Sequence, residues 1–257
     1  MADAVLEAVE GPDTTRAPAA VRFDAPGGGR SFRFHGPRGV LRAERMDEVL
    51  PVLAAVERAV ADGLHAAGFV AYEASPAFDP AFVTHPPDPR LPLAWFALYE
   101  RREDVHPTYD AAESQAELGP WRIDLDEAEY VRRIERIREL IAAGDSYQVN
   151  LTARLTASFR GDPRALYERL CLGQRSGFCA CLELGRGRTI VSASPELFFR
   201  RDADGLELRP MKGTRPRGRW VEEDRALAAE LAASPKDRAE NLMIVDLLRN
   251  DAGRVAV

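Results

Sequence analysis

Cysteine is scarce in this sequence, whose 257 residues include only Cys171, Cys179 and Cys181. An odd number of cysteines argues against a framework of disulfide bonds. The Cys-x-Cys pair also lacks the second Cys or His pair that a structural zinc site needs. We therefore expect all three cysteines to be small, buried side chains.

An excess of positive charge and long apolar runs are also missing. The net charge is −6 at pH 7, which argues against the basic surface that non-specific nucleic-acid binding requires. No apolar run approaches the roughly 20 residues of a membrane-spanning helix. The start has no basic segment followed by an apolar one, so it does not resemble a signal peptide. We expect a cytoplasmic protein with no nucleic-acid and no membrane partner.

The chain is long enough for one large domain or two small ones. Residues 1–20 are small, acidic and proline-containing, which predicts a mobile N-terminus. The proline-rich stretch 76–92 predicts an irregular loop. We place a boundary near Pro120, between an N-terminal subdomain (21–120) and a second part (121–257). The pattern of elements predicts an α+β fold with largely antiparallel sheets and helices packed outside them.

The N-terminal subdomain contains one clear helical pattern. Asp47 is a plausible helix N-cap, and the apolar residues that follow it recur at helical spacing. We expect these residues to face a core: Leu50, Leu53, Val56 and Val60. Strands are predicted at 68–73 and 93–100.

The second part begins with a helix and a long alternating stretch. Asp126 is the predicted N-cap of the helix and Gly144 its C-terminal stop. From Ser146 to Phe159 apolar and polar residues alternate, which predicts one long strand with an apolar back. Its polar front carries Gln148 and faces either water or a wet cavity.

Two hairpins are predicted next, one over residues 178–193 and one over residues 197–209 with a turn at 202–205. Together they give at least four strands in meander order. If the second turn centres on Ala203-Asp204, Glu196 lies opposite Met211 or Lys212. A carboxylate and an amine then meet at the open end of this hairpin, as a surface ion pair of little energetic weight or as a chemical pair.

The last helix has a strong predicted start, with Ser234 as N-cap and Pro235 in the first turn. From Leu242 to Leu248 only one residue is polar, which predicts a buried helix. Glu240 projects onto this apolar face, and an unpaired buried charge is unfavourable. Its partner is therefore either an arginine or a metal ion that takes oxygen ligands.

Four stretches carry the motif residues of the second part: Gly144–Leu151, Ser192–Phe198, Pro210–Gly218 and Lys236–Asp251. In this order they resemble the chorismate-utilising enzymes, which include anthranilate synthase large component, aminodeoxychorismate synthase component I, and isochorismate and salicylate synthases. The resemblance covers roughly residues 121–257. Residues 71–74 are more loosely similar to the N-terminal region of aminodeoxychorismate synthases.

Two residues indicate the member of this family. In the resemblance, the position of Lys212 is alanine in anthranilate and isochorismate synthases and lysine in aminodeoxychorismate synthase. The position of Gln148 is a water-activating lysine in isochorismate and salicylate synthases, and glutamine has no basic nitrogen. The resemblance therefore implies aminodeoxychorismate synthase component I, with an anthranilate-synthase-component-I-like fold and a role in para-aminobenzoate and folate synthesis.

The resemblance also implies roles for individual residues. Lys212 attacks the chorismate ring, and Glu196 is the general acid that helps the C4 hydroxyl leave. Ammonia then replaces the lysine and gives 4-amino-4-deoxychorismate. Gly213 and Thr214 match substrate-contacting positions, as substrate-binding residues with Gln148. Glu240 matches a ligand of Mg²⁺, which holds a substrate carboxylate.

The chemistry of the residues agrees with these roles. Hydroxide is a poor leaving group and needs a proton donor within reach. The attacking amine must be neutral, and cations nearby such as Arg215 and Arg217 would favour its neutral form.

The resemblance also sets limits and alternatives. In the family the catalytic domain continues beyond the part matched here, so we expect an N-terminal fragment that is poorly active alone. Ammonia normally comes from glutamine through an amidotransferase subunit or domain, and the sequence shows no amidotransferase motif. Two alternatives remain open: anthranilate synthase component I, and a non-catalytic chain that only binds the amidotransferase subunit.

Overall fold

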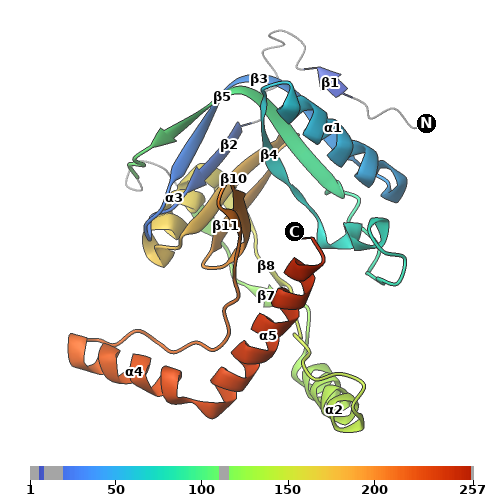
Figure 1. Ribbon diagram of the computed structural model, residues 1–257. Helices are drawn as coiled ribbons and strands as arrows, with labels where there is room; N and C mark the ends of the chain where they lie inside the picture. Colours follow the sequence, from blue (N-terminus) through green and yellow to red (C-terminus); the bar gives the residue numbers. More distant parts are fainter. Residues whose placement is uncertain (1–5, 9–19, 110–115, 256–257) are drawn as a thin grey trace. The chain divides into compact units, whose positions relative to one another are not determined.

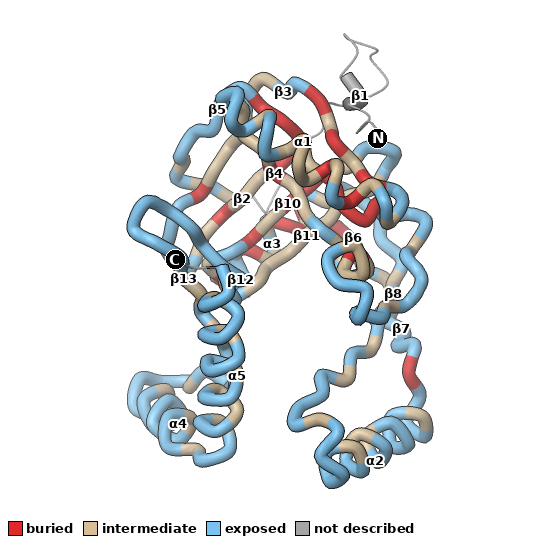
Figure 2. The backbone as a smooth tube through the Cα atoms, turned by 45° about the vertical axis from the view of Figure 1, so that its right-hand side comes forward, coloured by how far each residue is buried: buried red, intermediate tan, exposed pale blue. Residues whose placement is uncertain are grey.

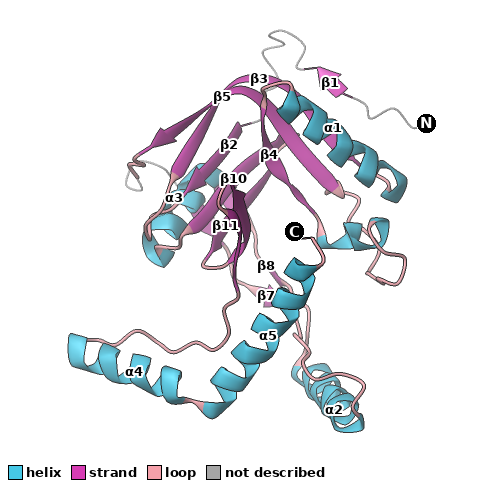
Figure 3. Cartoon of the chain, in the orientation of Figure 1, coloured by secondary structure: helices cyan, strands magenta, loops and turns pink. Residues whose placement is uncertain are grey.

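The computed structural model describes residues 6–8, 20–109 and 116–255 (Figure 1). The chain divides into two compact units. The first contains residues up to 108 and from 170 onward, and the second contains residues 109–169. Helices and antiparallel strands are mixed along the chain, as Figure 3 shows, and the predicted α+β class is confirmed.

A seven-stranded antiparallel sheet dominates the first unit. Its strands run in the order β11-β10-β2-β3-β5-β4, and the short β1 also pairs with β3. The strands are β1 (Leu6–Ala8), β2 (Ala20–Asp24), β3 (Ser31–Ala43), β4 (His65–Val70), β5 (Ala94–Val105), β10 (Phe178–Gly185) and β11 (Arg188–Ser194).

The hairpin of β10 and β11 was predicted, but its partner was not. β10 pairs with β2, with Cys179 opposite Asp24 and Glu183 opposite Ala20. The sheet therefore takes strands from both sides of the boundary expected near Pro120, and the predicted domain division stays a prediction. The expected four-strand meander is wrong, because β11 does not continue its pairing into the next strand of the chain.

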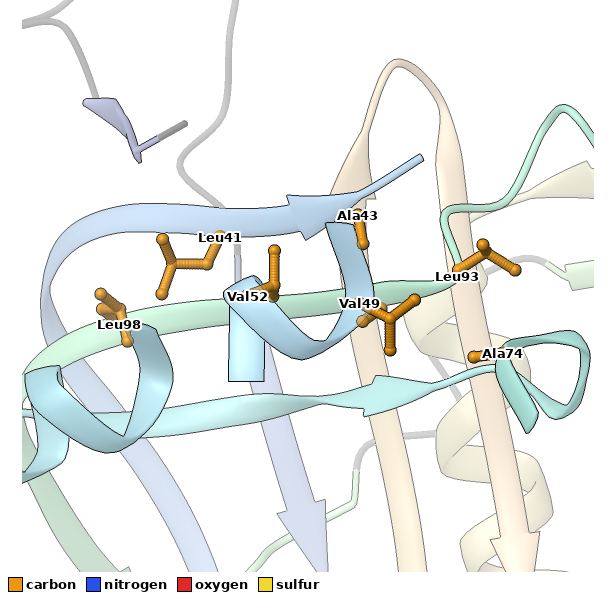
Figure 4. Packing of buried hydrophobic residues seen from close by; sticks show 8 residues of the cluster. Leu41, Ala43, Val49, Val52, Ala74, Leu93 and Leu98 are labelled. Carbon is orange, nitrogen blue, oxygen red and sulfur yellow. The ribbon is translucent and has the colours of Figure 1, made fainter. Parts of the chain in front are cut away.

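Helix α1 (Val49–Ala61) covers one face of this sheet, after the short 3-10 helix η1 (Met46–Glu48). Val49 and Val52 are buried against Leu41 and Leu98 (Figure 4). Burying such side chains stabilises a fold by roughly 1.5–3 kcal/mol each.

The predicted core face of α1 is only partly correct. Leu53 and Val56 pack against the core cluster, but Leu50 and Val60 keep about half of their surface exposed, at 51% and 49%. The helix begins with Val49, and the valines at positions 49, 52 and 56 set the buried stripe at i, i+3 and i+7.

Strand β5 supplies both faces of the sheet because its side chains alternate. Ala94 and Leu98 lie in the cluster under α1. Trp95, Ala97 and Tyr99 lie in a second cluster on the other face. The sheet is therefore apolar on both sides along this strand.

The three cysteines are buried, as predicted. Cys171 lies in α3 (Pro163–Gln174), and the other two lie on β10. Burial raises the pKa of the Cys179 thiol to about 12, so this thiol stays protonated and unreactive at neutral pH.

The second unit contains helix α2 and two small two-stranded sheets. Helix α2 (Glu127–Ala143) begins as predicted, because the Asp126 carboxylate accepts a 2.8 Å hydrogen bond from the Glu129 amide. It ends at Gly144, which has a left-handed φ of 82°. Short strands pair β6 (Ala116–Leu118) with β9 (Phe159–Gly161) and β7 (Arg122–Ile123) with β8 (Leu155–Thr156).

The long strand predicted from Ser146 to Phe159 is wrong. Only β8 and the first residue of β9 fall within it, and residues 148–154 have no regular secondary structure. Alternation alone does not make a strand, because a strand needs hydrogen bonds from a neighbouring strand. Within the described residues that pairing is confined to β7 and β6.

The chain continues in the first unit with β12 (Leu197–Asp202), β13 (Gly205–Arg209), α4 (Val221–Ala233) and α5 (Pro235–Gly253). The start of α5 is confirmed, since the Ser234 hydroxyl accepts from the Asp237 amide at 3.3 Å. The predicted burial of α5 is wrong: Leu242 is 69% exposed, and the helix is exposed or intermediate over its described length (Figure 2). Its apolar residues spread around the helix and form no single stripe against the rest of the unit.

In the described part of the chain, none of the helices combines the length and the hydropathy needed to cross a membrane.

Candidate functional site

The β12–β13 hairpin places Glu196 beside the segment that carries Lys212. Its turn is formed by Ala203 and Asp204, as predicted, because Asp202 pairs with Gly205. An irregularity between Leu197 and Arg200 shifts the register by one residue. At the open end, the Glu196 Oε1 atom accepts a long 3.4 Å hydrogen bond from the Met211 amide.

The backbone around Glu196 is fixed by Ser194. The Ser194 hydroxyl accepts from the Glu196 amide at 3.2 Å and donates to the Glu196 carbonyl at 3.3 Å. This local turn is typical of serine next to an extended strand. It leaves the exposed Glu196 carboxylate free to point toward Met211 rather than back along its own strand.

Lys212 follows Met211 directly and is partly buried. Within residues 6–8, 20–109 and 116–255, its amine lies within 4.0 Å of no carboxylate, so the ion pair with Glu196 that the sequence left open is not formed. The two side chains belong to backbone segments that meet at the same hairpin end. The structure therefore brings their backbones together without joining the charges.

Gly213 anchors the next part of this segment against α5. Its φ is 73°, in the left-handed region that favours glycine. A Cβ atom at this position would lie only 2.8 Å from the Asp237 Oδ1 atom and 3.0 Å from its Cβ atom. Glycine is therefore required for the close approach between the Lys212 segment and the first turn of α5.

Arg215 strengthens this contact. Its guanidinium bonds Glu230 of α4 at 2.9 Å and Asp237 of α5 at 3.1 Å. The side chains of Arg215 and Asp237 are 28% and 14% exposed, so the bridge is partly shielded from water. The Ser234 hydroxyl and the Arg215 charge hold the pKa of Asp237 below its usual value, and the carboxylate stays ionised.

Arg217 also forms an ion pair with a carboxylate. It binds Asp224 with two hydrogen bonds of 2.7 Å, and Asp224 also accepts from the Gly218 amide at 2.8 Å. The expectation that Arg215 and Arg217 favour a neutral Lys212 gains no support, because carboxylates already balance both charges. Their role in the structure is to hold the 213–218 segment on α4 and α5.

Glu240 lies three residues after Asp237, on the same side of α5. It is 36% exposed, and its nearest cation is Lys236 at 3.8 Å. Of the two partners that the sequence left open, an arginine or a metal ion, the arginine is not found: the ion pair is with Lys236, one turn earlier. Lys236 is 83% exposed, and such a pair contributes little to stability.

The described residues supply only part of a metal site. No group of three His, Cys, Asp or Glu side chains suited to a metal gathers within them. Mg²⁺ is usually held by one or two carboxylates together with water and substrate oxygens. Glu240 fits the role of one such carboxylate.

The remaining predicted residues differ in their surroundings. Thr214 is exposed beside Gly213, and its carbonyl accepts from Arg215 at 2.9 Å. Gln148 belongs to the second unit, where it is exposed in a segment without regular structure. Its carbonyl accepts from the Ser146 hydroxyl at 3.1 Å.

The sequence did not reveal the anchors of this site. The sequence pattern places Asp237 only within the Lys236–Asp251 stretch, and it does not single out Glu230. The Arg215 bridge joins residues 15 and 22 positions apart, so no local period or turn motif encodes it. The glycine that follows Lys212 was the available sequence signal of a tight backbone contact, and its φ of 73° bears this out.

Comparison with known proteins supports the family resemblance that the sequence motifs indicate. The family described as chorismate binding enzyme matches residues 19–257. The chain is 41% identical, over 169 residues, to aminodeoxychorismate synthase component 1 of Klebsiella aerogenes, which covers 66% of this chain and 36% of that protein. It is 44% identical, over 147 residues, to anthranilate synthase component 1 of Streptomyces coelicolor, which covers 56% and 29%.

A solved structure shows the same fold. The anthranilate synthase component I of Streptococcus pneumoniae superimposes with a TM-score of 0.61 at 20% identity, over 93% of this chain and 62% of that one. This confirms the predicted anthranilate-synthase-component-I-like fold. The chain spans about a third of the length of the curated relatives it matches. Since the family match extends over nearly the whole sequence, the chain belongs to the chorismate binding enzymes.

Proposed function

We propose that this chain carries the nucleophile and the general acid of an aminodeoxychorismate synthase component I. The observation that carries the proposal is the hairpin end, where the Glu196 carboxylate bonds the amide of the residue before Lys212. The family match and the relative of that name from Klebsiella aerogenes support it.

In the proposed reaction the neutral Lys212 amine forms a bond to a carbon of the chorismate ring. The ring electrons shift, the C4–O bond breaks, and Glu196 gives its proton to the departing hydroxyl, which leaves as water. Ammonia then bonds to C4, and the bond from the ring to Lys212 breaks as the electron pair returns to nitrogen. The net change is chorismate plus ammonia to 4-amino-4-deoxychorismate plus water.

Among the residues that the structure describes, no carboxylate lies within 4.0 Å of the Lys212 amine, which is consistent with this role. A salt-bridged ammonium holds its proton more strongly, whereas the nucleophile must lose it. Glu196 is exposed, and its contact with the Met211 amide is a single long hydrogen bond. Gly213 and Thr214, next to Lys212, are proposed substrate-binding residues of the same segment, and Gln148 is proposed separately as a substrate-binding residue of the second unit.

Glu240 is proposed as a ligand of Mg²⁺. When bound, the metal supplies positive charge to a substrate carboxylate. The weak Lys236 contact would be exchanged for the metal at little cost.

Anthranilate synthase component I is the second candidate, favoured by the 44% identity to the Streptomyces coelicolor protein. Lys212 argues against it, because the resemblance places alanine there in anthranilate synthases. The products separate the two activities: anthranilate formation expels the enolpyruvyl group, and aminodeoxychorismate keeps it.

The substrate ammonia is proposed to come from a glutamine amidotransferase subunit. We also propose the cytoplasm as the place of action. A chain that only binds this subunit, without catalysis, is the third candidate. It differs from the first in one respect: it makes no covalent or product-forming contact with chorismate.

The test uses a chimera in which this chain replaces the matching third of the Klebsiella aerogenes enzyme. It is incubated with chorismate, Mg²⁺ and ammonium, and mass spectrometry follows the product and any protein adduct. We expect 4-amino-4-deoxychorismate, and a trapped adduct of chorismate minus water on Lys212. Lys212→Ala should lose the adduct and nearly all turnover, and the matched control Lys236→Ala should keep both.

Two results would overturn the proposal: anthranilate with pyruvate as the products, or full turnover by the Lys212→Ala variant. A chimera that folds and binds the amidotransferase but leaves chorismate unchanged would instead favour the non-catalytic candidate. The 257-residue chain alone should turn over chorismate poorly, and robust turnover would contradict that expectation.

A further inference from the structure

The Lys212 segment, residues 211–218, has no regular secondary structure. It follows β13 and precedes α4 without forming a helix or a strand. Among the described residues, no backbone-to-backbone hydrogen bond involves this segment. Backbone groups without such partners must be satisfied by side chains or by water. The position of Lys212 therefore depends on a few side-chain contacts.

Two side-chain contacts hold the ends of the Lys212 segment. At its start, the Glu196 carboxylate accepts from the Met211 amide at 3.4 Å. At its end, Asp224 of α4 accepts from Arg217 at 2.7 Å and from the Gly218 amide at 2.8 Å. These contacts join the segment to the start of the β12–β13 hairpin and to α4. Neither of them reaches α5, the helix that carries the proposed metal ligand.

Arg215 lies between these ends and bonds three groups at once. Its guanidinium donates to Asp237 of α5 at 3.1 Å, to Glu230 of α4 at 2.9 Å and to the Thr214 carbonyl at 2.9 Å. Within the part of the chain that the structure describes, the bond to Asp237 is the only hydrogen bond from this segment to α5. A lysine ammonium carries the same charge on a compact head and cannot reproduce this planar fork. The bridge therefore depends on the shape of the arginine side chain as well as on its charge.

The Asp237 end of this bridge lies close to both parts of the proposed site. A Cβ atom on Gly213 would lie 2.8 Å from the Asp237 Oδ1 atom, so the backbone next to Lys212 packs on this carboxylate. Glu240 follows three residues later in α5, and side chains at this spacing share one face, with Cβ atoms roughly 5–6 Å apart. Asp237 therefore contacts the backbone beside the nucleophile and lies one helical turn before the proposed metal ligand.

We propose that Arg215 is a positioning residue for Lys212. Its bond to Asp237 holds the Lys212 segment on α5 and thereby sets the nucleophile relative to Glu240. The inference rests on the proposed function, in which Lys212 attacks chorismate and Glu240 is a ligand of Mg²⁺. In this role Arg215 acts only through the place of Lys212. A misplacement of about 1 Å can cost a reaction roughly a hundredfold in rate.

Two simpler roles for Arg215 make different predictions. If it acted by charge, it would favour the neutral form of Lys212, and Arg215→Lys would keep the activity. If it only stabilised the fold, the contact with Glu230 would matter as much as the contact with Asp237. The charge of Arg215 is already balanced by these two carboxylates, which favours the geometric role.

The test compares four variants of the chimera described above. Arg215→Lys keeps the positive charge and removes the fork. Asp237→Ala removes the α5 end of the bridge, and Glu230→Ala removes its α4 end. The matched control is Arg217→Lys, which breaks the two 2.7 Å bonds to Asp224 without touching α5. Circular dichroism checks that each variant folds, and the rates are measured at a temperature at which the folded form predominates.

The first measurement is the single-turnover rate at which the adduct forms on Lys212, with saturating chorismate and Mg²⁺. The two variants that break the α5 contact, at positions 215 and 237, should slow the adduct roughly ten- to a hundredfold. The variants at positions 230 and 217 should keep the rate within about threefold of the parent. The pH dependence should keep its shape in Arg215→Lys, and the half-saturating Mg²⁺ concentration should change little, because Glu240 remains on α5.

The second measurement uses the 257-residue chain without substrate. Trypsin cleaves the bond after Lys212 when the segment comes away from α5, and mass spectrometry follows this cut. The same two variants should be cut there severalfold faster than the parent, and the control at the rate of the parent. Arg215 precedes Pro216, and a bond before proline resists trypsin, so Arg215→Lys creates no new site.

An adduct rate in Arg215→Lys equal to that of the parent overturns the inference, as does equal slowing by Asp237→Ala and Glu230→Ala. A slow rate that extra Mg²⁺ restores would place the effect at the metal ligand, and a shifted pH profile would place it in the charge of Lys212; both also overturn the inference. Equal trypsin cleavage in all variants overturns it as well. If the parent chimera forms no adduct, the proposed function fails, and this inference fails with it. A normal parent with unaffected variants removes only the role of Arg215.

Discussion

Replacing Gly213 by alanine tests the contact that holds the Lys212 segment on α5. Gly213 has a φ of 73°, which costs a residue with a Cβ atom about 1–2 kcal/mol. The new Cβ atom would also lie 2.8–3.0 Å from three atoms of Asp237. Overpacking of this kind typically costs about 1–3 kcal/mol. We expect Gly213→Ala to lower the free energy of unfolding by about 2–5 kcal/mol.

Gly187 provides the matched control. Its φ of 70° is almost the same, but no atom lies within 4 Å of its constructed Cβ atom. Gly187→Ala should therefore cost only the backbone part, about 1–2 kcal/mol. The difference between the two variants measures the crowding against Asp237.

Urea unfolding followed by circular dichroism gives both free energies, and hydrogen exchange at Met211 and Thr214 reports on the segment itself. Adding Asp237→Ala to Gly213→Ala removes two of the three crowded atoms, so the pair of changes should cost less than the sum of the single changes. Equal losses for Gly213→Ala and Gly187→Ala, with strictly additive effects of Asp237→Ala, would refute the reasoning.

Three further predictions concern the core, a pH-sensitive contact and the thiols. Leu41→Ala should lower the free energy of unfolding by about 2–5 kcal/mol, since Leu41 is 2% exposed. The half-exposed Leu50 should lose well under about 1 kcal/mol on replacement by alanine. Urea unfolding compares the two variants, and similar losses would contradict the packing of α1. The Arg217 hydrogen bond lowers the pKa of Asp224 from 3.8 to about 2. The stabilising effect of this contact is therefore complete above pH 3.8 and is lost as the pH falls toward 2. Asp224→Asn should remove this part of the acid sensitivity, and a variant with the same stability profile as the parent between pH 5 and about 2 would contradict the prediction. With a pKa of about 12, Cys179 should resist iodoacetamide at pH 8 in the folded protein and react after unfolding, and rapid labelling of the folded chain, read by mass spectrometry, would be the contrary result.

Local features of the fold were predictable because the signals sit within a few residues. Asp126 and Ser234 cap their helices as expected, and Gly144 ends α2 in a left-handed conformation. The turn at Ala203 and Asp204 follows from the Asp/Gly chemistry of tight hairpins. The two caps and the turn depend on side chain to backbone hydrogen bonds, and the end of α2 depends on the conformational freedom of glycine.

Features that depend on distant partners were not predictable in the same way. The alternation after Ser146 met the pattern of a strand, but pairing decides whether a strand forms. The apolar run in α5 met the pattern of a buried helix, yet Leu242 and Met243 remain exposed. An apolar pattern shows that a helix can be buried, but burial also requires a second surface against which the helix packs.

The candidate site shows the same division. The approach of Glu196 to the Lys212 segment follows from hairpin geometry, and the register error was a single residue. The Arg215 bridge to Glu230 and Asp237 joins three elements, and sequence gave no spacing rule for it. The family resemblance predicts which residues form the site, and the folded chain shows what holds their segment in place.

The pairing of β10 with β2 has a consequence for synthesis on the ribosome. β2 ends at Asp24, and β10 begins at Phe178, more than 150 residues later. At roughly 5–20 residues per second, the outer edge of β2 waits about 8–30 s for its neighbour. During that interval an unpaired strand edge is open to wrong partners, so a nascent chain of this protein should depend on chaperones until its second hairpin emerges.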